Sequence, residues 1–279
     1  MDPDEYRRSS LDNWAAMARG WERWRAEIEA TSAPIRDWML SALAPEPGDT
    51  ILELAAGPGD LGFGAAELVG DGGHLISTDF SPDMVDIARR RSGDLGLSNV
   101  EHRVMDAEQM DLEDASVDGV LCRFGFMLMP RPEVALSETG RVLRSGGRLA
   151  LAVWCSADRN PWISIAGRLL VERGHLPPPE PGAPGMFSMA SEERTRGLLE
   201  EAGFSRVRME EVPVWFRYPS LEEYVRRARD TGGVFSRVFA EADEGERAVL
   251  EAELESRFEP FAVESGYDFP GVALAATAG

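Results

Sequence analysis

The stretch Thr50-Ile-Leu-Glu53-Leu-Ala-Ala-Gly57-Pro-Gly59-Asp-Leu-Gly62 decides the fold of this chain. Its first half is apolar apart from Glu53, and its second half carries three glycines within six positions. A short apolar run that ends in a glycine turn and continues into a helical pattern is typical of a buried strand followed by a crossover helix. We therefore expect a strand over Thr50–Ala56, then a tight turn and a helix.

The same alternation repeats further along the chain. Ser81–Leu95 has helical periodicity, with Ser81 as the expected N-cap and Pro82 at the first helical position. Strands and helices that alternate in this way form right-handed crossovers and a mostly parallel sheet covered on both faces. The sequence therefore predicts an α/β, doubly wound, Rossmann-like fold with seven strands. The further strands are predicted at His74–Asp79, Val100–Met105, Val117–Phe124 and Arg148–Trp154.

The flanking segments complete a single domain over residues 1–279. Residues 1–45 are expected to form two N-terminal helices broken at Pro34, residues 46–174 the cofactor-binding core, and residues 175–279 the rest of the sheet. The last part is expected to begin with the Pro-rich loop Pro177–Gly185 and to include a helical insertion before the last strand. Its elements are predicted at Ser191–Ala202 (helix, ended by Gly203), Arg206–Tyr218 (strand), Glu241–Glu259 (helix) and Phe269–Ala278 (strand).

The charge of the chain excludes several classes of partner. The formal net charge is -20, and all 29 basic residues are Arg, because the sequence contains no Lys. Schiff-base lysine chemistry and the P-loop lysine are therefore absent. An acidic surface repels nucleic-acid backbones and anionic lipids, so we expect neither a nucleic-acid nor a membrane partner.

The cysteines and the first residues indicate a cytoplasmic protein. Cys122 and Cys155 each lie in an apolar run, and two cysteines are too few for a disulfide framework. Residues 1–10 are charged and lack the apolar stretch of a signal peptide, and no window approaches the length of a membrane span. His74 and His102 lie in strand runs without metal-ligand spacing, so no metal site is expected.

The glycine turn allows two interpretations. Gly57-x-Gly59-x-x-Gly62 matches the dinucleotide fingerprint, and Asp79 lies where that fingerprint expects a ribose-binding acid, which makes a nicotinamide-dependent oxidoreductase one alternative. However, Pro58 has no N–H to offer a pyrophosphate, and Glu53 places a carboxylate nearby. A ligand that carries an ammonium and a sulfonium group suits these residues better, because Glu53 attracts the cation and the glycines permit close backbone approach.

At this point the sequence resembles the class I S-adenosylmethionine-dependent methyltransferases. The match begins at Glu53-x-Ala55-x-Gly57-x-Gly59, where Ala55 stands in place of a frequent Gly, and continues through Ser77–Met84 and Val104–Glu108. It extends over Asp118–Phe126 and Leu143–Leu151, the latter resembling the turn before the fifth strand. The resemblance covers about residues 48–154.

The resemblance implies a binding site for S-adenosylmethionine. Asp79 would accept hydrogen bonds from the ribose hydroxyls, Met84 would pack on the adenine, and Asp106 would accept a hydrogen bond from the adenine amino group. Since Glu53, Asp79 and Asp106 each follow a different strand, they are expected to meet at the carboxyl edge of the sheet. The implied cofactor-binding residues are Glu53, Ala55, Gly57, Gly59, Asp79, Phe80, Met84, Asp106, Ala107, Glu108 and Arg123.

The implied reaction is methyl transfer to a small molecule, as in relatives from quinone and natural-product biosynthesis. Apolar and aromatic residues dominate the regions outside the resemblance, which favours a small, partly apolar methyl acceptor. Methyl transfer mainly requires alignment and exclusion of water, so no catalytic residue is predicted. His175 is either a general base or an exposed loop residue, and Gly20–Arg25 is either a lid over the donor or a packing segment. A donor-binding protein without methyltransferase activity is the second alternative, and the oligomeric state is open.

Overall fold

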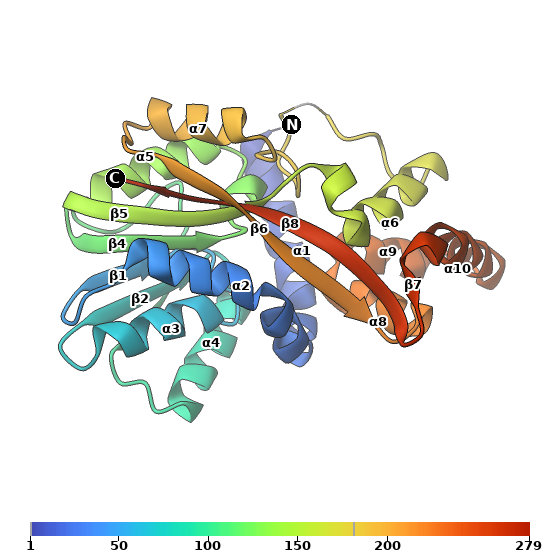
Figure 1. Cartoon of the computed structure of the whole chain (residues 1–279), viewed down its shortest axis with the longest axis horizontal. Helices are drawn as coiled ribbons and strands as arrows, with labels where there is room; N and C mark the ends of the chain where they lie inside the picture. Colours follow the sequence, from blue (N-terminus) through green and yellow to red (C-terminus); the bar gives the residue numbers. More distant parts are fainter. Residues whose placement is uncertain (1, 181) are drawn as a thin grey trace.

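The computed structural model describes residues 2–180 and 182–279, so Pro181 of the predicted Pro-rich loop lies outside the described residues. Within them, one sheet has the strand order β3-β2-β1-β4-β5-β8-β6, and the short β7 pairs with β8 (Figure 1). The first five strands are parallel, and β8 is antiparallel to both β5 and β6. The strands are β1 (Thr50–Glu53), β2 (His74–Asp79), β3 (Val100–Val104), β4 (Val117–Arg123), β5 (Leu143–Trp154), β6 (Arg208–Tyr218), β7 (Ala262–Val263) and β8 (Gly266–Ala278).

Helices cover both faces of this sheet. α2, α3 and α4 lie on one face and α5 and α7 on the other, while α8, α9 and α10 form an insertion between β6 and β8 (Figure 1). The doubly wound α/β fold and its helical insertion are confirmed. The helices are α1 (Pro3–Arg23), α2 (Arg25–Leu43), α3 (Asp60–Val69), α4 (Pro82–Asp94), α5 (Pro132–Val142), α6 (Pro161–Glu172), α7 (Glu192–Glu201), α8 (Leu221–Thr231), α9 (Gly233–Glu241) and α10 (Glu244–Phe258), with short 3-10 turns η1 (Phe126–Leu128), η2 (Ala157–Arg159) and η3 (Glu259–Phe261).

The core follows from the apolar central strands. Ile51 and Leu52 of β1 are buried, and so is every residue of β5 from Leu149 to Trp154. Parallel strands that are covered on both faces form continuous apolar runs in the sequence, because side chains on both faces are buried. α4 begins as predicted, with the Ser81 side chain accepting from the backbone N–H of Met84 and Pro82 in the first turn.

The N-terminal helices differ from the prediction in where they break. Pro34 lies inside α2, and the chain turns instead at Trp24. The Trp24 ring is 7% exposed, and its Nε1 donates to Asp230 Oδ2 of α8 at 2.8 Å. α2 then packs on the sheet, whereas α1 crosses the carboxyl ends of the strands (Figure 1).

Several strand boundaries also differ from the prediction, most of all those of β1, β5 and β8. β1 ends at Glu53, since Ala55 has a left-handed backbone with a φ of 52°. β5 begins at Leu143, and the expected turn at Gly146 and Gly147 is a register shift within the strand. β8 begins at Gly266, and the two-residue β7 brings the sheet to eight strands rather than seven among the described residues.

Candidate functional site

Glu53 lies at the end of β1 and is 2% exposed. Its Oε1 accepts a hydrogen bond from the backbone N–H of Gly62, in the first turn of α3, at 2.9 Å. A Cβ on Gly62 would lie 2.1 Å from Glu53 Oε2. The third glycine of the motif is therefore required by the buried carboxylate, because any side chain at position 62 would displace it.

The other carboxylate oxygen of Glu53, Oε2, has no hydrogen-bond partner among the described residues and is inaccessible to solvent. Burial raises the pKa of Glu53 to about 8, and the nearby Arg123 guanidinium offsets only part of this effect. A buried carboxylate oxygen without a partner is costly unless a ligand supplies a donor. An ammonium group suits this position, because it brings both a hydrogen bond and a positive charge.

The glycine turn lies beside Asp79, at the end of β2. Gly57 and Gly59 have φ values of 53° and 91°, which glycine adopts without strain. Asp79 Oδ2 accepts from the Gly57 N–H at 2.9 Å, and Oδ1 accepts from the Ser81 N–H at 2.8 Å. Burial raises the pKa of Asp79, although the backbone donors, which include the Phe80 N–H, oppose the shift. A carboxylate has about four acceptor positions, so these three backbone donors leave Asp79 with capacity for a further donor.

The segment after β3 brings Asp106, Ala107 and Glu108 to the same edge. Ala107 is buried, and Asp106 Oδ1 accepts from the Glu108 N–H at 2.8 Å. The Glu108 side chain is only 1% exposed and is paired with Arg131 and with Arg7 of α1. The Glu108 side chain is therefore enclosed by hydrogen-bond donors of the protein.

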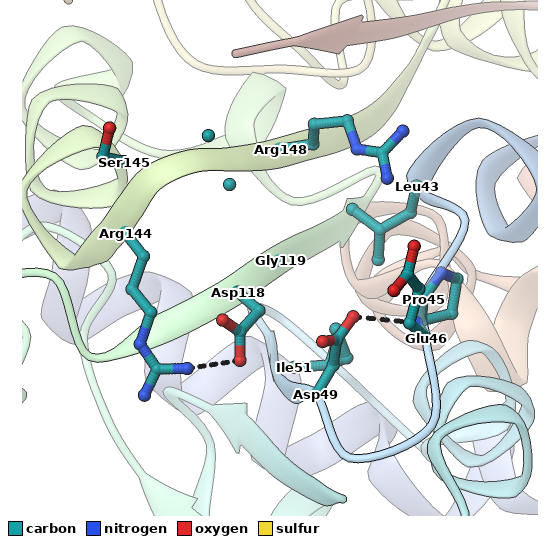
Figure 2. A pocket seen from close by; sticks show the side chains of 12 residues that line it. Leu43, Pro45, Glu46, Asp49, Ile51, Asp118, Gly119, Arg144, Ser145 and Arg148 are labelled. Atoms are coloured by element: carbon teal, nitrogen blue, oxygen red, sulfur yellow. Dashed lines mark hydrogen bonds and ion pairs between the residues drawn. The ribbon is translucent and has the colours of Figure 1, made fainter.

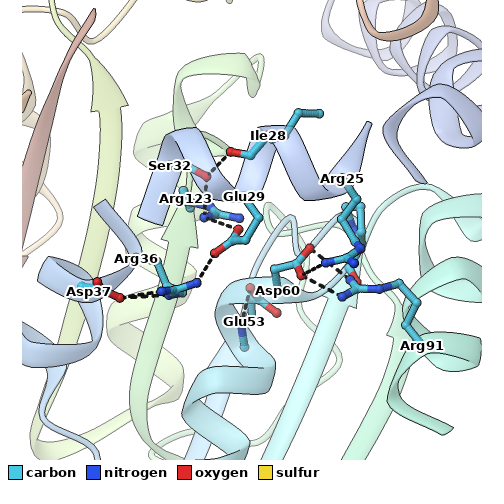
Figure 3. A network of polar contacts seen from close by, with 12 residues as sticks. Arg25, Ile28, Glu29, Ser32, Arg36, Asp37, Glu53, Asp60, Arg91 and Arg123 are labelled. Carbon is cyan, nitrogen blue, oxygen red and sulfur yellow. Dashed lines mark hydrogen bonds and ion pairs between the residues drawn. The ribbon is translucent and has the colours of Figure 1, made fainter. Parts of the chain in front are cut away.

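Arg123 is the last residue of β4 and points toward α2 (Figure 3). Its Nη1 donates to Glu29 Oε2 at 3.0 Å and to Ser32 Oγ at 3.1 Å. Nearby, Asp60 at the start of α3 is paired with Arg25 of α2 at 3.0 Å. These contacts fix α2 against the carboxyl edge of the sheet.

Met84 is 2% exposed and belongs to a small apolar cluster beneath α1. Ala18 of α1 and Ile87 of α4 are the other buried members, with Trp14 and Trp21 packed against them. α1 therefore covers the Met84 side chain. Gly20–Arg25 packs mainly on α8, where Trp21 Nε1 donates to Thr231 O at 3.2 Å.

The chain matches a family model described as a methyltransferase domain over residues 45–173. Over 186 residues it is 31% identical to the ubiquinone/menaquinone biosynthesis C-methyltransferase UbiE of Rhizobium leguminosarum bv. trifolii, covering 62% of this chain and 71% of that protein. The chain belongs to the class I S-adenosylmethionine-dependent methyltransferases, of the quinone-biosynthesis type. Its cofactor is S-adenosylmethionine, and its activity is methyl transfer from that donor. Neither the oxidoreductase nor the non-catalytic alternative is supported.

Solved structures agree with this methyltransferase in fold. The YcgJ protein of Bacillus subtilis has a TM-score of 0.61 at 15% identity, over 87% of this chain and 96% of that one. A putative methyltransferase of Haloferax volcanii, solved in complex with the Trm112 activator, has a TM-score of 0.58 at 20% identity, over 97% of this chain and 96% of that one. Likeness at this level of identity extends to the architecture alone.

A cluster of stacked aromatic side chains lies next to the carboxyl ends of β4 and β5. Phe124, with a φ of 63°, stacks on Trp154 with ring centroids 4.2 Å apart. Trp162 of α6 meets Trp154 edge-on at 5.3 Å and stacks on Phe216 of β6 at 3.8 Å. A positive φ at a bulky residue is a strained conformation that often marks a functional position. The sequence alone did not reveal this stack, because its members are far apart along the chain.

Two other features lie away from the methyltransferase site. A cavity of about 250 Å³ opens at the amino edge of the sheet, where Arg144 is paired with Asp118 (Figure 2). His175 Nε2 lies 2.8 Å from Glu246 Oε1 of α10, so this histidine is engaged in the insertion rather than at the donor edge. None of the helices in the described part of the chain combines the length and apolarity needed to span a bilayer.

Proposed function

We propose that this methyltransferase holds the ammonium group of its donor at Glu53 and methylates a ring carbon of a small, partly apolar hydroquinone. The observation that carries the proposal is the buried Glu53 Oε2, which has no partner among the described residues and is adjacent to the glycine turn. A cationic methyl donor supplies the hydrogen bond and the positive charge that this oxygen lacks.

The other proposed contacts to S-adenosylmethionine are distributed along the same edge of the sheet. Asp79 accepts from the ribose with the acceptor capacity that its backbone N–H partners leave free, and Gly57 and Gly59 allow the ligand close to the main chain. Asp106 accepts from the adenine amino group. When bound, S-adenosylmethionine supplies an electrophilic methyl group on a sulfonium ion.

The acceptor class is supported by both the relatives and the aromatic stack. Relatives from Rhizobium leguminosarum bv. trifolii and Brucella anthropi carry the name of a C-methyltransferase of ubiquinone and menaquinone biosynthesis. Phe124, Trp162 and Phe216 are partly exposed aromatic side chains around the buried Trp154, and aromatic side chains of this kind suit a planar ring.

The protein's contribution to the chemistry is alignment and exclusion of water. Methylation of a ring carbon would convert the bound donor to S-adenosylhomocysteine and release the ring hydrogen as one proton, so that charge and atoms balance. Phe124 orients the acceptor ring, and α1 shields the donor from solvent. No side chain is assigned as a base.

The acceptor proposal is tested with a methyl-deuterated donor and a panel of demethylated hydroquinones, catechols and amines. Mass spectrometry of the products is expected to place the label on carbon of a hydroquinone. Trp162→Ala is expected to raise the KM for the acceptor about tenfold, on the scale of a lost aromatic contact. Trp215→Ala, on an exposed neighbour of Phe216, is the matched control. Labelling of nitrogen or oxygen alone would contradict the proposal.

We also propose that the chain acts as a single domain in the cytoplasm. α1 packs against both α4 of the core and α8 of the insertion, which supports one cooperative unit. Cys122 and Cys155 are free and buried, as in a reducing compartment. A single urea unfolding transition, seen equally by circular dichroism and tryptophan fluorescence, is expected. Two separated transitions would argue against one unit.

A further inference from the structure

Arg7 of α1 reaches the segment that follows β3. Its Nε lies 3.1 Å from Asp106 Oδ2, and its Nη2 donates to Glu108 Oε2. Glu108 also accepts from Arg131, through the backbone N–H at 3.0 Å and through Nε at 2.8 Å. The Arg7 guanidinium group therefore bridges Asp106 and Glu108, and its Nη1 also pairs with Asp4 of α1 at 2.7 Å. Glu108 is anchored independently of α1, through Arg131.

α1 is held on both sides of this contact. On the N-terminal side of Arg7, the Tyr6 hydroxyl donates to Leu128 O at 3.1 Å. In the C-terminal part of α1, Gly20 packs so closely on α8 that a Cβ there would lie 1.9 Å from Asp230 O. The position of Arg7 is thus fixed by contacts other than its own ion pairs.

The Asp106 carboxylate can still accept hydrogen bonds on its exposed side. Its Oδ1 accepts from the Glu108 N–H and its Oδ2 faces Arg7, while the side chain is still 36% exposed. An ionised carboxylate offers about four acceptor positions, so Asp106 retains free lone pairs on its exposed side. The Glu108 N–H and Arg7 each contact one oxygen of this carboxylate, so both restrict its orientation.

We propose that Arg7 is a positioning residue of the donor site, which orients Asp106 to accept the adenine amino group. This inference rests on the proposed role of Asp106. In this arrangement α1 does more than cover the donor, because it contributes to recognition of the adenine base. An Arg at this position suits the task, since its planar fork reaches two carboxylates at once.

The experiment compares two ligands that differ at the adenine amino group. Dissociation constants for S-adenosylhomocysteine and for S-inosylhomocysteine, which has a carbonyl there, are measured by calorimetry on the full chain. The parent is expected to prefer the adenosyl ligand at least about tenfold, as expected for a hydrogen bond to a charged group. Arg7→Met is expected to reduce this preference about fivefold. Arg8→Met, which removes the same charge from an exposed neighbour, is the matched control and is expected to retain the preference.

Arg7→Lys gives a second, conservative comparison. Lys retains the charge without the fork, so it is expected to restore only part of the preference. Equal weakening of both ligands in Arg7→Met would mean that α1 has a merely structural role and would overturn the inference. Tighter adenosyl binding in that variant would also overturn it, because Arg7 would then compete with adenine. Absence of any preference in the parent would instead reject the proposed role of Asp106 itself.

Discussion

Replacing Glu53 with Gln is expected to stabilise the free protein, and by more as the pH rises. Burial raises the pKa of Glu53 from 4.5 to about 8. The folded chain therefore keeps a proton that the unfolded chain releases between these two values. Consequently, the free energy of unfolding of the parent falls as the pH rises through this window, whereas an amide at this position does not titrate.

The magnitude follows from the difference in bound protons. Over the window, one proton is linked to unfolding, which changes the free energy of unfolding by about 1.4 kcal/mol per pH unit. Between pH 5.5 and pH 7.5 the parent is therefore expected to lose about 2–3 kcal/mol relative to Glu53→Gln. Above the pKa of Glu53 the difference levels off.

Urea unfolding without donor at pH 5.5, 6.5, 7.5 and 8.5 measures this difference. Other titrating groups cancel, because they are common to parent and variant. Glu67→Gln, on an exposed residue of α3, is the control and is expected to give the same difference at every pH. If the parent and Glu53→Gln show parallel curves, the carboxylate is not held in the costly environment described above.

The same substitution is expected to weaken donor binding. At pH 8.5 Glu53→Gln removes the charge proposed to attract the donor's ammonium group, so S-adenosylhomocysteine is expected to bind more weakly although the fold is more stable. 5′-Methylthioadenosine, which lacks the ammonium group, is the control ligand and is expected to lose less affinity. Opposite changes in stability and binding distinguish a lost ligand contact from misfolding.

Three further substitutions test the surroundings of Glu53. Gly62→Ala is expected to displace the Glu53 carboxylate and to lower the free energy of unfolding by about 1–3 kcal/mol in urea titrations. An unchanged urea midpoint would contradict the close packing of Glu53 Oε2 on Gly62. Ala55→Gly is expected to raise that free energy by up to about 1 kcal/mol, because glycine relieves the positive φ, and a loss of stability would show that no strain is relieved. Asp79→Ala is expected to weaken S-adenosylhomocysteine binding by about 1.5–3 kcal/mol in calorimetry, whereas Asp83→Ala, on an exposed residue of α4, retains the parent affinity.

The fold was predictable from sequence where local patterns and tertiary structure agree. The strand at His74–Asp79 has the predicted bounds because its apolar run is also its buried run. α4 begins where Ser81 and Pro82 indicate, since capping is determined by adjacent residues. The converging acids were predictable for a related reason, because parallel strands bring their carboxyl ends to one edge.

Features set by distant contacts were not predictable. The break between α1 and α2 falls at Trp24, which is flanked by no Gly or Pro, because Asp230 binds its ring nitrogen. Arg7 was missed as a site residue for the same reason, since its partners lie about a hundred positions away in the chain. No local pattern distinguishes such an Arg from a solvated one.

Two of the five non-glycine residues with a positive φ in the described part of the chain lie at the carboxyl ends of β1 and β4. Ala55 and Phe124 both have positive φ, and a Cβ on Gly125 would lie 2.7 Å from the Cβ of Ala55, so these two strained segments touch. Glu53, with its unpartnered oxygen, ends β1 beside them. Strain and uncompensated charge persist in native proteins mainly where a ligand or a reaction uses them. These features lie beneath α1, which bridges the core and the insertion, and together they suit a site for a cationic methyl donor. The bound cation would offset the cost of burying Glu53. Without the donor, the protein is expected to be less stable than its Glu53→Gln variant.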